Sequence, residues 1–453
     1  MSRAKFVTGS PMRHIVVMTG ASTLSLFAIF AVDLVDMFFL SLLGEVALAA
    51  AIGFAGSILF FTTSVCIGMA IAAGALVSRA LGAEDEGRAA QYYLHVGASA
   101  LGLTVPLAGL MWWFIPDLLG LLGAEGRALE LGTAYLQIII PSMPVLALAM
   151  VSNATLRALG DPKRSTAAML TGGLVNAVMD PILIFGLDLG VEGAAWASVL
   201  SRATIFVLAV GWVYRVYGLI GRFQWRAYLG DVAAITRVAG PALLTNIATP
   251  IGTAYVTAAM AVYGSDDVAA SAVINRLTPL TFAPLFALSG AIGPIFGQNF
   301  GAQRPDRVRQ TLLDSYLLVA GYAVAIYAVM FLARHEITAA FSLDGLSAEL
   351  VIFYCAVLVP SFGFNGLGFA SNAAFNNLGV AHYATVANIA KETLGTIPLV
   401  YVGSALFGAP GALAGRALAM VVVGTAGALV ALGFVNRLGP RAPAANPAPQ
   451  ADG

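Results

Sequence analysis

Long apolar segments recur along this chain and leave little room for a soluble fold. Twelve segments reach or exceed about 20 residues, the length that an α-helix needs to cross the hydrocarbon core of a bilayer. Of the 453 residues, 59% are hydrophobic and only 10% are charged, too few charges for the surface of a soluble protein of this size. The pattern predicts an all-α polytopic membrane protein with spans near residues 15–42, 47–78, 92–115, 131–156, 167–187, 192–216, 237–263, 268–297, 311–333, 349–375, 383–403 and 410–436.

The loops between these spans alternate in charge. We call the side rich in Arg and Lys the basic end, and the side that carries mostly Asp and Glu the acidic end. Because cytoplasmic loops are enriched in Lys and Arg, the pattern predicts that both termini lie in the cytoplasm and that the protein spans the cytoplasmic (inner) membrane repeatedly. The basic loops contain Arg3, Lys5, Arg13, Arg79, Arg88, Arg157, Lys163, Arg164, Arg215, Arg222, Arg226, Arg237, Arg304, Arg307, Arg309, Arg437 and Arg441. The acidic loops contain Glu45, Asp117, Glu125, Asp188, Glu192, Asp266 and Asp267.

The second half of the chain repeats the first at a constant spacing, which is set by the recurrence of Gly82-Ala83 as Gly301-Ala302. An even number of spans in each copy means that both copies face the same way, as parallel repeats about an axis along the membrane normal. This arrangement is typical of secondary transporters. The same spacing pairs Tyr135 with Tyr354, Pro141-Ser142 with Pro360-Ser361, Asn153 with Asn372 and Leu159-Gly160 with Leu378-Gly379, and a spacing shorter by one pairs Gly190 with Gly408 and Gly193 with Gly411.

The repeat also predicts the domain organisation. Residues 1–216 form an N-terminal lobe, and residues 237–436 form a C-terminal lobe. Residues 217–236 are a cytoplasmic connector whose aromatic and basic residues suggest a segment on the membrane surface. The Pro- and Ala-rich tail, 437–453, is expected to be disordered.

Acids inside the predicted spans are few, and they favour a functional role because each costs about 2.5–3.5 kcal/mol on insertion scales. Asp33 and Asp36 are one helical turn apart and share a face of the first span. Asp180, in the fifth span, directly precedes Pro181, which cannot donate a helical hydrogen bond and should bend the helix. By residue count Asp36 and Asp180 reach similar depth, where they could bind and release H⁺ or hold Na⁺. The alternative is that these acids only line a water-filled vestibule.

The second repeat lacks these acids. Tyr255 stands at the counterpart of Asp36, and Pro398 stands at the counterpart of Asp180. This asymmetry predicts that ion coupling belongs to the N-terminal half, where several polar side chains accompany the acids. Taken one at a time, such side chains are ordinary packing contacts between helices. They are Asn153, Asn176, Gln137, Tyr135 and Ser198. The charged residues in the second-repeat spans are Arg276, Lys391, Glu392 and Arg416, of which we interpret Lys391 and Glu392 as structural and leave the other two as gates or helix ties.

Aromatic and Met side chains are spread over many spans. Most are expected to face lipid or core, but some could line an adaptable apolar cavity between the halves. The sequence contains no phosphate loop, zinc-ligand spacing or nucleophile elbow, which predicts a protein that is not an enzyme and needs no cofactor or nucleic-acid partner. The cavity candidates are Phe54, Met69, Tyr255, Met260, Phe282 and Phe286.

Several short motifs, in this order, resemble the MATE (multidrug and toxic compound extrusion) family and most of all its DinF branch. The resemblance extends from the first span to the twelfth. The residues that carry it are Val35-Asp36-Met37-Phe38-Phe39, Gly82-Ala83, Leu159-Gly160-Asp161-Pro162, Asn176 to Phe185, Gly190-x-x-Gly193-Ala194 and Gly301-Ala302.

The resemblance implies a V-shaped pair of six-helix lobes. It also implies efflux of amphipathic, often cationic compounds in exchange for H⁺ or Na⁺, at coupling acids that match Asp36 and Asp180. The accompanying polar positions of the DinF branch match Tyr135, Asn153, Asn176 and Ser198.

We therefore expect a monomeric secondary multidrug efflux transporter that works by alternating access, with H⁺ favoured over Na⁺ as the coupling ion. Within transport, the alternative is a flippase for a lipid or a lipid-linked oligosaccharide, which would need a basic cavity. The candidates for that cavity, Arg202, Arg276, Lys391 and Arg416, are scattered along the sequence. A channel or a membrane-embedded enzyme are further alternatives, and the enzyme would need a catalytic constellation.

Overall fold

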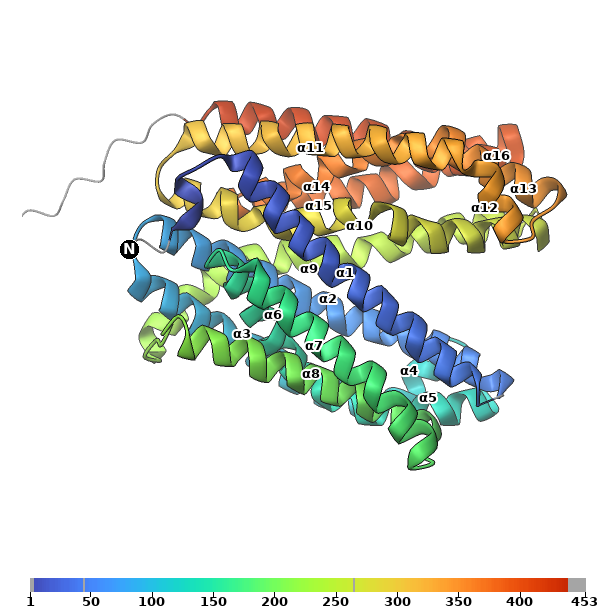
Figure 1. Ribbon diagram of the computed structural model, residues 1–453, viewed down its shortest axis with the longest axis horizontal. Coiled ribbons are helices and arrows are strands. Elements are labelled where there is room, and N and C mark those ends of the chain that lie inside the picture. The colour runs from blue at the N-terminus through green and yellow to red at the C-terminus, as the bar shows by residue number, and fades with distance from the viewer. Residues whose placement is uncertain (1–3, 44, 264, 439–453) are drawn as a thin grey trace, which may run out of the picture.

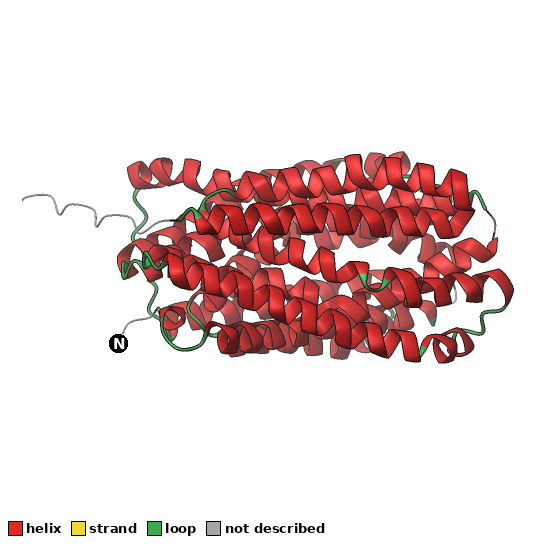
Figure 2. Cartoon of the chain, turned by 90° about the horizontal axis from the view of Figure 1, so that it is seen from above, coloured by secondary structure: helices red, strands yellow, loops and turns green. Residues whose placement is uncertain are grey.

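The computed structural model describes residues 4–43, 45–263 and 265–438, and within them it contains helices and no β-strand (Figures 1 and 2). The helices run along one long axis between the basic and acidic ends. The α-helices are α1 (Pro11–Ser41), α2 (Val46–Gly82), α3 (Glu86–Trp113), α4 (Ile115–Leu121), α5 (Gly126–Ile139), α6 (Met143–Ala158), α7 (Pro162–Pro181), α8 (Gly190–Arg215), α9 (Trp225–Ala261), α10 (Ser265–Gly301), α11 (Pro305–Leu332), α12 (Arg334–Ala340), α13 (Gly345–Phe353), α14 (Ser361–Leu378), α15 (Ala381–Ala390) and α16 (Thr396–Asn436).

The described helices account for twelve spans. Ten are long and apolar enough to cross a membrane by themselves, and the bent pair α13 and α14, with an angle of 54°, makes an eleventh. The run 381–436 contains two spans, because Gly408 leaves helical geometry at φ +64° and ψ −145°. Beyond that kink the chain turns back on itself, since a Cβ on Gly403 would overlap the backbone of Gly411. The predicted twelve-span, all-α fold is therefore confirmed.

The helices form two bundles, each with its own apolar core. One core draws on α2, α3, α5, α6 and α8, which we call the N-bundle together with α4 and α7. The other core draws on α10, α11, α13, α14 and α16, which we call the C-bundle together with α12 and α15. In Figure 1 the bundles meet at the basic end, where the N-terminus lies, and diverge toward the acidic end. This is the predicted V shape.

The first helix of each repeat crosses from one bundle to the other. Ile15 of α1 belongs to the C-bundle core, and Leu40, at the other end of α1, belongs to the N-bundle core. Conversely, Val238 of α9 belongs to the N-bundle core and Met260 to the C-bundle core. Figure 1 shows the diagonal path of α1 across the molecule. Nothing in the sequence indicated this exchange, because apolar side chains fit either core equally well.

Two expectations of the sequence need correction at the ends of helices. The connector is shorter than 217–236, because α9 begins at Trp225 and continues into the span without a break. The short helices α4 and α12 were not expected, and their first residues, Ile115 and Arg334, are counterparts at the spacing of the repeat. The predicted disordered tail, beyond Leu438, lies outside the described residues.

The Leu159-Gly160-Asp161-Pro162 motif builds the turn before α7. Gly160 has φ +69°, and the Asp161 carboxylate accepts a hydrogen bond from the backbone N–H of Arg164 at 3.1 Å. The Tyr217 hydroxyl donates to the same carboxylate at 2.6 Å. Burial alone would raise the pKa of Asp161, but the hydrogen bonds from Tyr217 and Arg164 outweigh it and lower this pKa. The motif is thus a helix cap that starts the helix carrying Asp180.

Candidate functional site

Small residues press α7 against α8 and so fix the place of Asp180. A Cβ on Gly172 would overlap the side chain of Ile205, and one on Gly193 would overlap the backbone of Leu183. The Ser201 hydroxyl also donates to the carbonyl oxygen of Gly172 at 2.8 Å. Backbone approaches of this kind are possible only without side chains, which explains the glycines on these two helices.

The irregular helix expected at Pro181 is present. Regular α-helical geometry ends at Pro181, and residues Ile182–Gly186 continue as a π-helix before the turn to α8. The proline removes one helical hydrogen bond and crowds the carbonyl of Ala177, so the backbone around Asp180 is less tightly bonded than a regular helix. Single π-turns of this kind occur often at functional sites.

The side chains of Asp36 and Asp180 meet, although they come from α1 and α7, far apart in the sequence. Their carboxyl groups are within hydrogen-bonding reach of each other. Asp180 is 0% exposed, and its Oδ1 accepts a hydrogen bond from the Asn176 amide at 3.3 Å. Its Oδ2 is buried and accepts no hydrogen bond from the described residues. Two carboxylates this close repel each other strongly unless a proton or a metal cation lies between them.

Tyr135 and Ser198 complete this cluster, and Arg202, which was not predicted to belong to it, adds a positive charge. The Tyr135 ring is buried close to both acids and to Arg202, with the Ser198 hydroxyl within hydrogen-bonding reach. Arg202 donates to the Ser142 hydroxyl at 2.8 Å. It follows Ser198 by about one helical turn, so both lie on one face of α8, a signal that could have found it. We call Asp36, Asp180, Asn176, Tyr135 and Ser198 the acid-pair site.

Of the predicted members, Asn153 lies away from the acid-pair site, and the side chain of Asp33 lies outside the described residues. The Asn153 amide donates to the carbonyl of Ala149 at 3.1 Å and contacts the Met169 sulfur at 3.8 Å. Met169 precedes Asn176 by about two helical turns, so Asn153 lies nearer the basic end. The side chain of Asp33 is not among those that the structure describes, although its backbone belongs to α1.

Three of the six residues expected to line a cavity are buried in the apolar cores in this conformation. Met69 is 4% exposed, whereas Met260 and Phe282 are 0% exposed, and all three belong to apolar cores. Phe282 stacks on Phe362 with 4.0 Å between ring centroids. Partly exposed positions are held by the other three, Phe54, Tyr255 and Phe286.

At the basic end, the two bundles are joined by hydrogen bonds from two side chains that are counterparts in the repeat. Arg79 of α2 donates to the carbonyl oxygens of Asn377 at 2.7 Å and Asn376 at 2.9 Å, in the last turn of α14. Gln298 of α10, the counterpart of Arg79 in the second repeat, donates to the carbonyl of Ala158 at the end of α6, at 2.8 Å. Each side chain thereby caps a helix of the other bundle.

The backbones of α2 and α10 touch at the same place. A Cβ on Gly82 would overlap the carbonyl oxygen of Gln298, and one on Gly301 would overlap the carbonyl oxygen of Arg79. These are the glycines of the repeated Gly-Ala motif. The glycines of this motif therefore allow α2 and α10 to cross in close contact between the bundles. The sequence repeat did not indicate this role.

The N-terminal segment lies across this junction. The backbone N–H of Phe6 donates to Gln298 Oε1 at 2.8 Å, and the Arg307 guanidinium donates to the carbonyl oxygens of Phe6 at 2.9 Å and Gly9 at 3.0 Å. Lys5 reaches the N-bundle, where its Nζ donates to the carbonyl of Gly160 at 3.2 Å. Contacts from both bundles thus hold the segment at the basic end.

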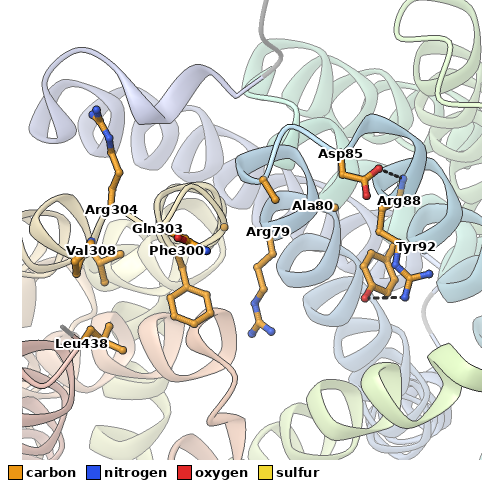
Figure 3. Close-up of a pocket in the computed structure, with 13 residues that line it drawn as sticks. Arg79, Ala80, Asp85, Arg88, Tyr92, Phe300, Gln303, Arg304, Val308 and Leu438 are labelled. Atoms are coloured by element: carbon orange, nitrogen blue, oxygen red, sulfur yellow. Dashed lines mark hydrogen bonds between the residues drawn. The ribbon is translucent and has the colours of Figure 1, made fainter. Parts of the chain in front are cut away.

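A cavity of about 360 Å³ lies between the α2–α3 and α10–α11 turns on the same end (Figure 3). Arg79 and Phe300 border it from the two bundles, with the guanidinium carbon 5.8 Å from the ring centroid. Arg88 also borders this cavity, but its guanidinium is engaged in an ion pair. The Arg88 guanidinium donates to both oxygens of Asp231, at 3.1 Å and 2.5 Å.

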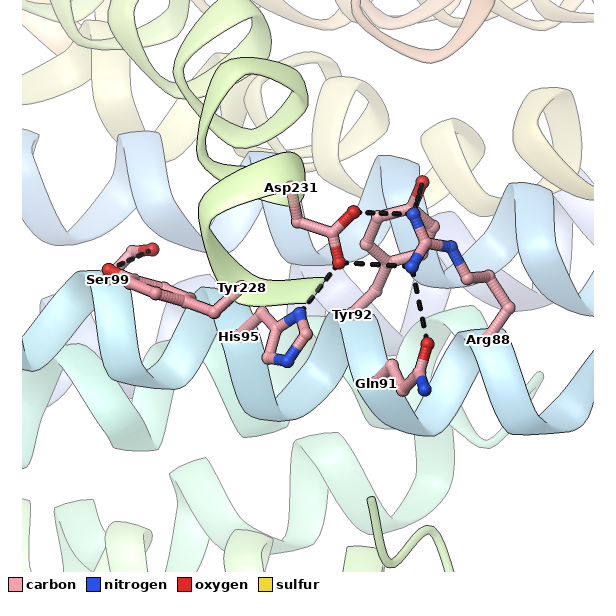
Figure 4. Close-up of polar contacts among 7 residues, drawn as sticks. All are labelled: Arg88, Gln91, Tyr92, His95, Ser99, Tyr228 and Asp231. Atoms are coloured by element: carbon pink, nitrogen blue, oxygen red, sulfur yellow. Dashed lines mark hydrogen bonds and ion pairs between the residues drawn. The ribbon is translucent and has the colours of Figure 1, made fainter. Parts of the chain in front are cut away.

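Asp231 links the start of α9 to α3 (Figure 4). This residue is 2% exposed, and its carboxylate lies 2.7 Å from Nδ1 of the fully buried His95. The Tyr228 ring packs edge-on against His95, with 5.6 Å between ring centroids. This arrangement holds the first turns of α9 on the N-bundle.

Replacing Asp231 with Asn should therefore lower stability. The change leaves Arg88 without its acid, and we expect a loss of about 2–3 kcal/mol, less than for a wholly buried pair because Arg88 is partly exposed. Thermal unfolding in detergent would show this as a lower melting temperature. The matched control is Glu130→Gln, whose exposed side chain pairs with Arg127 and should cost under about 0.5 kcal/mol. Equal melting temperatures for the two variants would contradict the assigned role.

Comparisons with known proteins agree with this architecture. The chain is 29% identical over 413 residues to the FAD transporter of Shewanella oneidensis, covering 89% of this chain and 90% of that protein. It is 26% identical over 347 residues to the multidrug export protein MepA of Staphylococcus aureus, covering 76% of each. A solved outward-facing multidrug resistance MATE family transporter matches with a TM-score of 0.89 and 22% identity, over 97% of this chain and 99% of that one.

The family profile described as MatE matches twice, at residues 21–182 and 241–402. The two matches start at nearly the spacing of the sequence repeat, and each takes in the first helix of one copy. Because the profile covers most of the chain and the fold agrees with it, the protein belongs to the MatE family of membrane transporters.

Proposed function

We propose that this transporter exports amphipathic, often cationic organic compounds in exchange for H⁺ or Na⁺ that moves inward at the acid-pair site. The observation that carries the proposal is the meeting of Asp36 and Asp180, with one buried oxygen of Asp180 that the described residues leave without a donor. A shared proton satisfies this pair without other ligands, whereas Na⁺ needs oxygen atoms on several sides. H⁺ is therefore the favoured coupling ion.

The basic end is cytoplasmic in this proposal. Both termini then lie on the cytoplasmic side of the inner membrane, and the bundles diverge toward its outer side. The structure then corresponds to an outward-facing state, closed by Arg79, Gln298 and the crossing of Gly82 with Gly301. An inward-facing state requires these contacts to separate. The lobes that move are the N-bundle and the C-bundle, joined by residues 217–224 and by the crossing helices α1 and α9, in a chain that acts as a monomer.

The transport cycle follows from the charge of the acid pair. Outside, the pair takes up a cation, which removes the repulsion between the carboxylates and changes the packing of α1 against the irregular turn at Pro181. Release of the cation inside restores the charge and the affinity for substrate. Each inward elementary charge gains about 2.3 kcal/mol per 100 mV of membrane potential.

The names of the relatives support export of small organic molecules and suggest a wide range of them. MepA is a multidrug export protein, and the relative from Shewanella oneidensis is a transporter of FAD, a compound that carries phosphates. Both relationships extend over at least three quarters of this chain. We infer that organic cations are substrates and that compounds with anionic groups are also admissible.

Dye transport in inside-out vesicles tests the proposal and the choice of ion together. An imposed proton gradient, acidic inside the vesicle, should drive ethidium uptake by the wild-type protein, and an imposed Na⁺ gradient of the same size should drive much less. Vesicles without the transporter are the control for passive leak. Uptake that ignores both gradients would refute coupled antiport, and uptake driven by Na⁺ alone would reassign the coupling ion.

A further inference from the structure

A second polar site lies in the C-bundle at the place that the repeat assigns to the acid-pair site. Tyr354 is the counterpart of Tyr135, and Arg416 is the counterpart of Ser198 at the spacing that pairs Gly190 with Gly408. The Tyr354 ring is buried, and its hydroxyl lies 2.9 Å from the Thr278 hydroxyl. The same position in the fold therefore carries a cation in the C-bundle where the N-bundle has a hydroxyl.

Lys391 and Glu392 of the C-bundle neutralise each other. Lys391 Nζ lies 3.0 Å from Glu392 Oε1 and donates to Asn365 Oδ1 at 3.2 Å. Both side chains are almost completely buried, at 10% and 5% exposure. Room for the carboxylate comes from Gly252 of α9, because a Cβ there would overlap Glu392 Oε2. The sequence interpretation of this pair as structural thus has a physical basis, but the pair leaves Arg416 without an acid of its own.

Arg416 is left with a surplus positive charge and open donors. Within the described residues, its guanidinium makes one hydrogen bond, from Nη2 to the Thr253 hydroxyl at 3.1 Å. Glu392 and Tyr354 are close enough to influence it electrostatically, but Glu392 already contacts Lys391. Two cations and one acid leave one net positive charge inside an apolar span. Such a charge is costly unless an anion or water compensates it.

Two other helix arginines each donate to two neutral partners. Arg79 donates to two carbonyl oxygens at a helix end, and Arg202 donates to the Ser142 hydroxyl and to the carbonyl of Ile139. Arg416 has one neutral partner and keeps the rest of its planar donor set available. That donor set matches the two oxygens of a carboxylate or a phosphate.

Irregular helices mark both polar sites. Besides the π-turn at Ile182–Gly186, the described residues contain π-turns at Tyr354–Leu358 and Lys391–Gly395. Each of the latter two begins at a residue of the C-bundle site. Because π-turns persist mainly where function requires a side chain to be displaced from the regular helical position, they support a working role for this place.

We propose that the C-bundle site formed by Arg416, Lys391, Glu392, Thr253 and Tyr354 binds a carboxylate or phosphate group of the transported compound. This inference rests on the proposed function and deepens it: besides organic cations, the transporter takes amphipathic compounds that carry an anionic group, and this site recognises that group. Arg416 is the specificity-determining residue. Lys391 and Glu392 neutralise each other, so the site as a whole carries one positive charge, that of Arg416. The two bundles then present opposite charges to a substrate, negative at the acid-pair site and positive at the C-bundle site.

Equilibrium binding to the full-length protein in nanodiscs tests this with probes that differ only in the anionic group. The phosphate pair is flavin mononucleotide and riboflavin, and the carboxylate pair is norfloxacin and its methyl ester. Wild-type protein should bind the anionic member of at least one pair roughly ten- to hundred-fold more tightly, as expected for charge-assisted hydrogen bonds. The pair that shows the preference identifies the group.

Arg416→Gln should abolish that preference and leave the affinity for riboflavin or the ester unchanged. Arg416→Lys, which keeps the charge but loses the planar fork, should retain part of it. The control is Arg127→Gln, which removes the same charge from an exposed side chain at the acidic end and should change nothing. Unchanged affinity for the probes without the anionic group shows that Arg416→Gln is folded.

Two results would overturn the proposal: a wild-type protein that binds both members of each pair equally, and an Arg416→Gln variant that keeps the full preference. The binding measurement needs no ion gradient. A failure of coupled antiport therefore appears only in the vesicle experiment, whereas a failure of the C-bundle site appears only in the binding of the paired probes.

Discussion

Asp180→Asn and Asp36→Asn should each reduce gradient-driven efflux to the level of protein-free vesicles. Asn keeps the shape and some hydrogen bonds of Asp but cannot bind and release a proton or attract Na⁺ as a carboxylate does. Because the two carboxyl groups are within hydrogen-bonding reach of each other, loss of either one removes the shared cation. Ethidium efflux in proteoliposomes under a proton gradient, and separately under a Na⁺ gradient, measures the effect.

The folded state should survive both changes, since a buried carboxylate without full compensation is a cost to the fold rather than a support. We expect melting temperatures in detergent equal to or above that of the wild type. Glu45→Gln is the control, because this acid is 44% exposed at the acidic end and pairs with Arg127. Normal gradient-driven efflux by either Asp variant would remove that acid from the coupling mechanism.

Gly82→Val should prevent the bundles from closing at the basic end. A Cβ at this position overlaps the carbonyl oxygen of Gln298, and neither backbone can yield because α2 and α10 are long packed helices. The bundles must therefore separate, and the population shifts to states that are open at the basic end. Efflux should fall severely even though Gly82 belongs to no polar site.

Spin labels can report the separation. Gly87→Cys and Asp306→Cys place labels at exposed counterpart positions of the repeat, one on each bundle beside the junction. The native Cys66 and Cys355 are buried, which protects them from labelling. Gly82→Val should lengthen the distance between the labels measured by pulsed electron paramagnetic resonance.

The control for this experiment lies on the same helix. Gly74→Ala adds a Cβ that meets only the Ala154 Cβ, at 3.9 Å, an ordinary contact that should leave the distance unchanged. A Gly82→Val protein with the wild-type distance distribution would show that the glycine crossing does not decide closure.

Much of the fold follows from the sequence because its causes are local or repeated. Apolar length predicts the twelve spans, and the internal repeat predicts two equivalent bundles. The glycines before the last span of each copy illustrate this: Gly190 and Gly408 both have positive φ, +54° and +64°, because the same backbone turn is needed twice. Three features of the fold escaped prediction, namely the short helices α4 and α12, the extent of α9, and the exchange of α1 and α9 between the cores.

The acid-pair site was also predicted only in part from the sequence. Asp36 and Asp180 could be predicted because acids in apolar spans are costly. Pro181 could be predicted because proline has no backbone N–H and disrupts the hydrogen bonding of any helix whose interior contains it. The sequence placed Asn153 in the same cluster, although a contact with Met169 holds this amide about two turns away. The sequence also suggested Met69, Met260 and Phe282 as cavity residues, because apolar side chains give the same sequence pattern in a core as in a binding site.

Apolar length and internal repetition were enough to predict that this chain crosses the membrane in twelve helices, that its halves are copies, and that the acids lie in one copy. The packing of the helices was needed to show that Asp36 meets Asp180, that Arg416 contacts Thr253 and has no acid of its own among the described residues, and that Gly82 and Gly301 close the basic end. Helix formation and membrane insertion depend on residues within about 20 positions of each other. These sites depend instead on how helices from distant segments cross, and no stretch of sequence contains that information by itself.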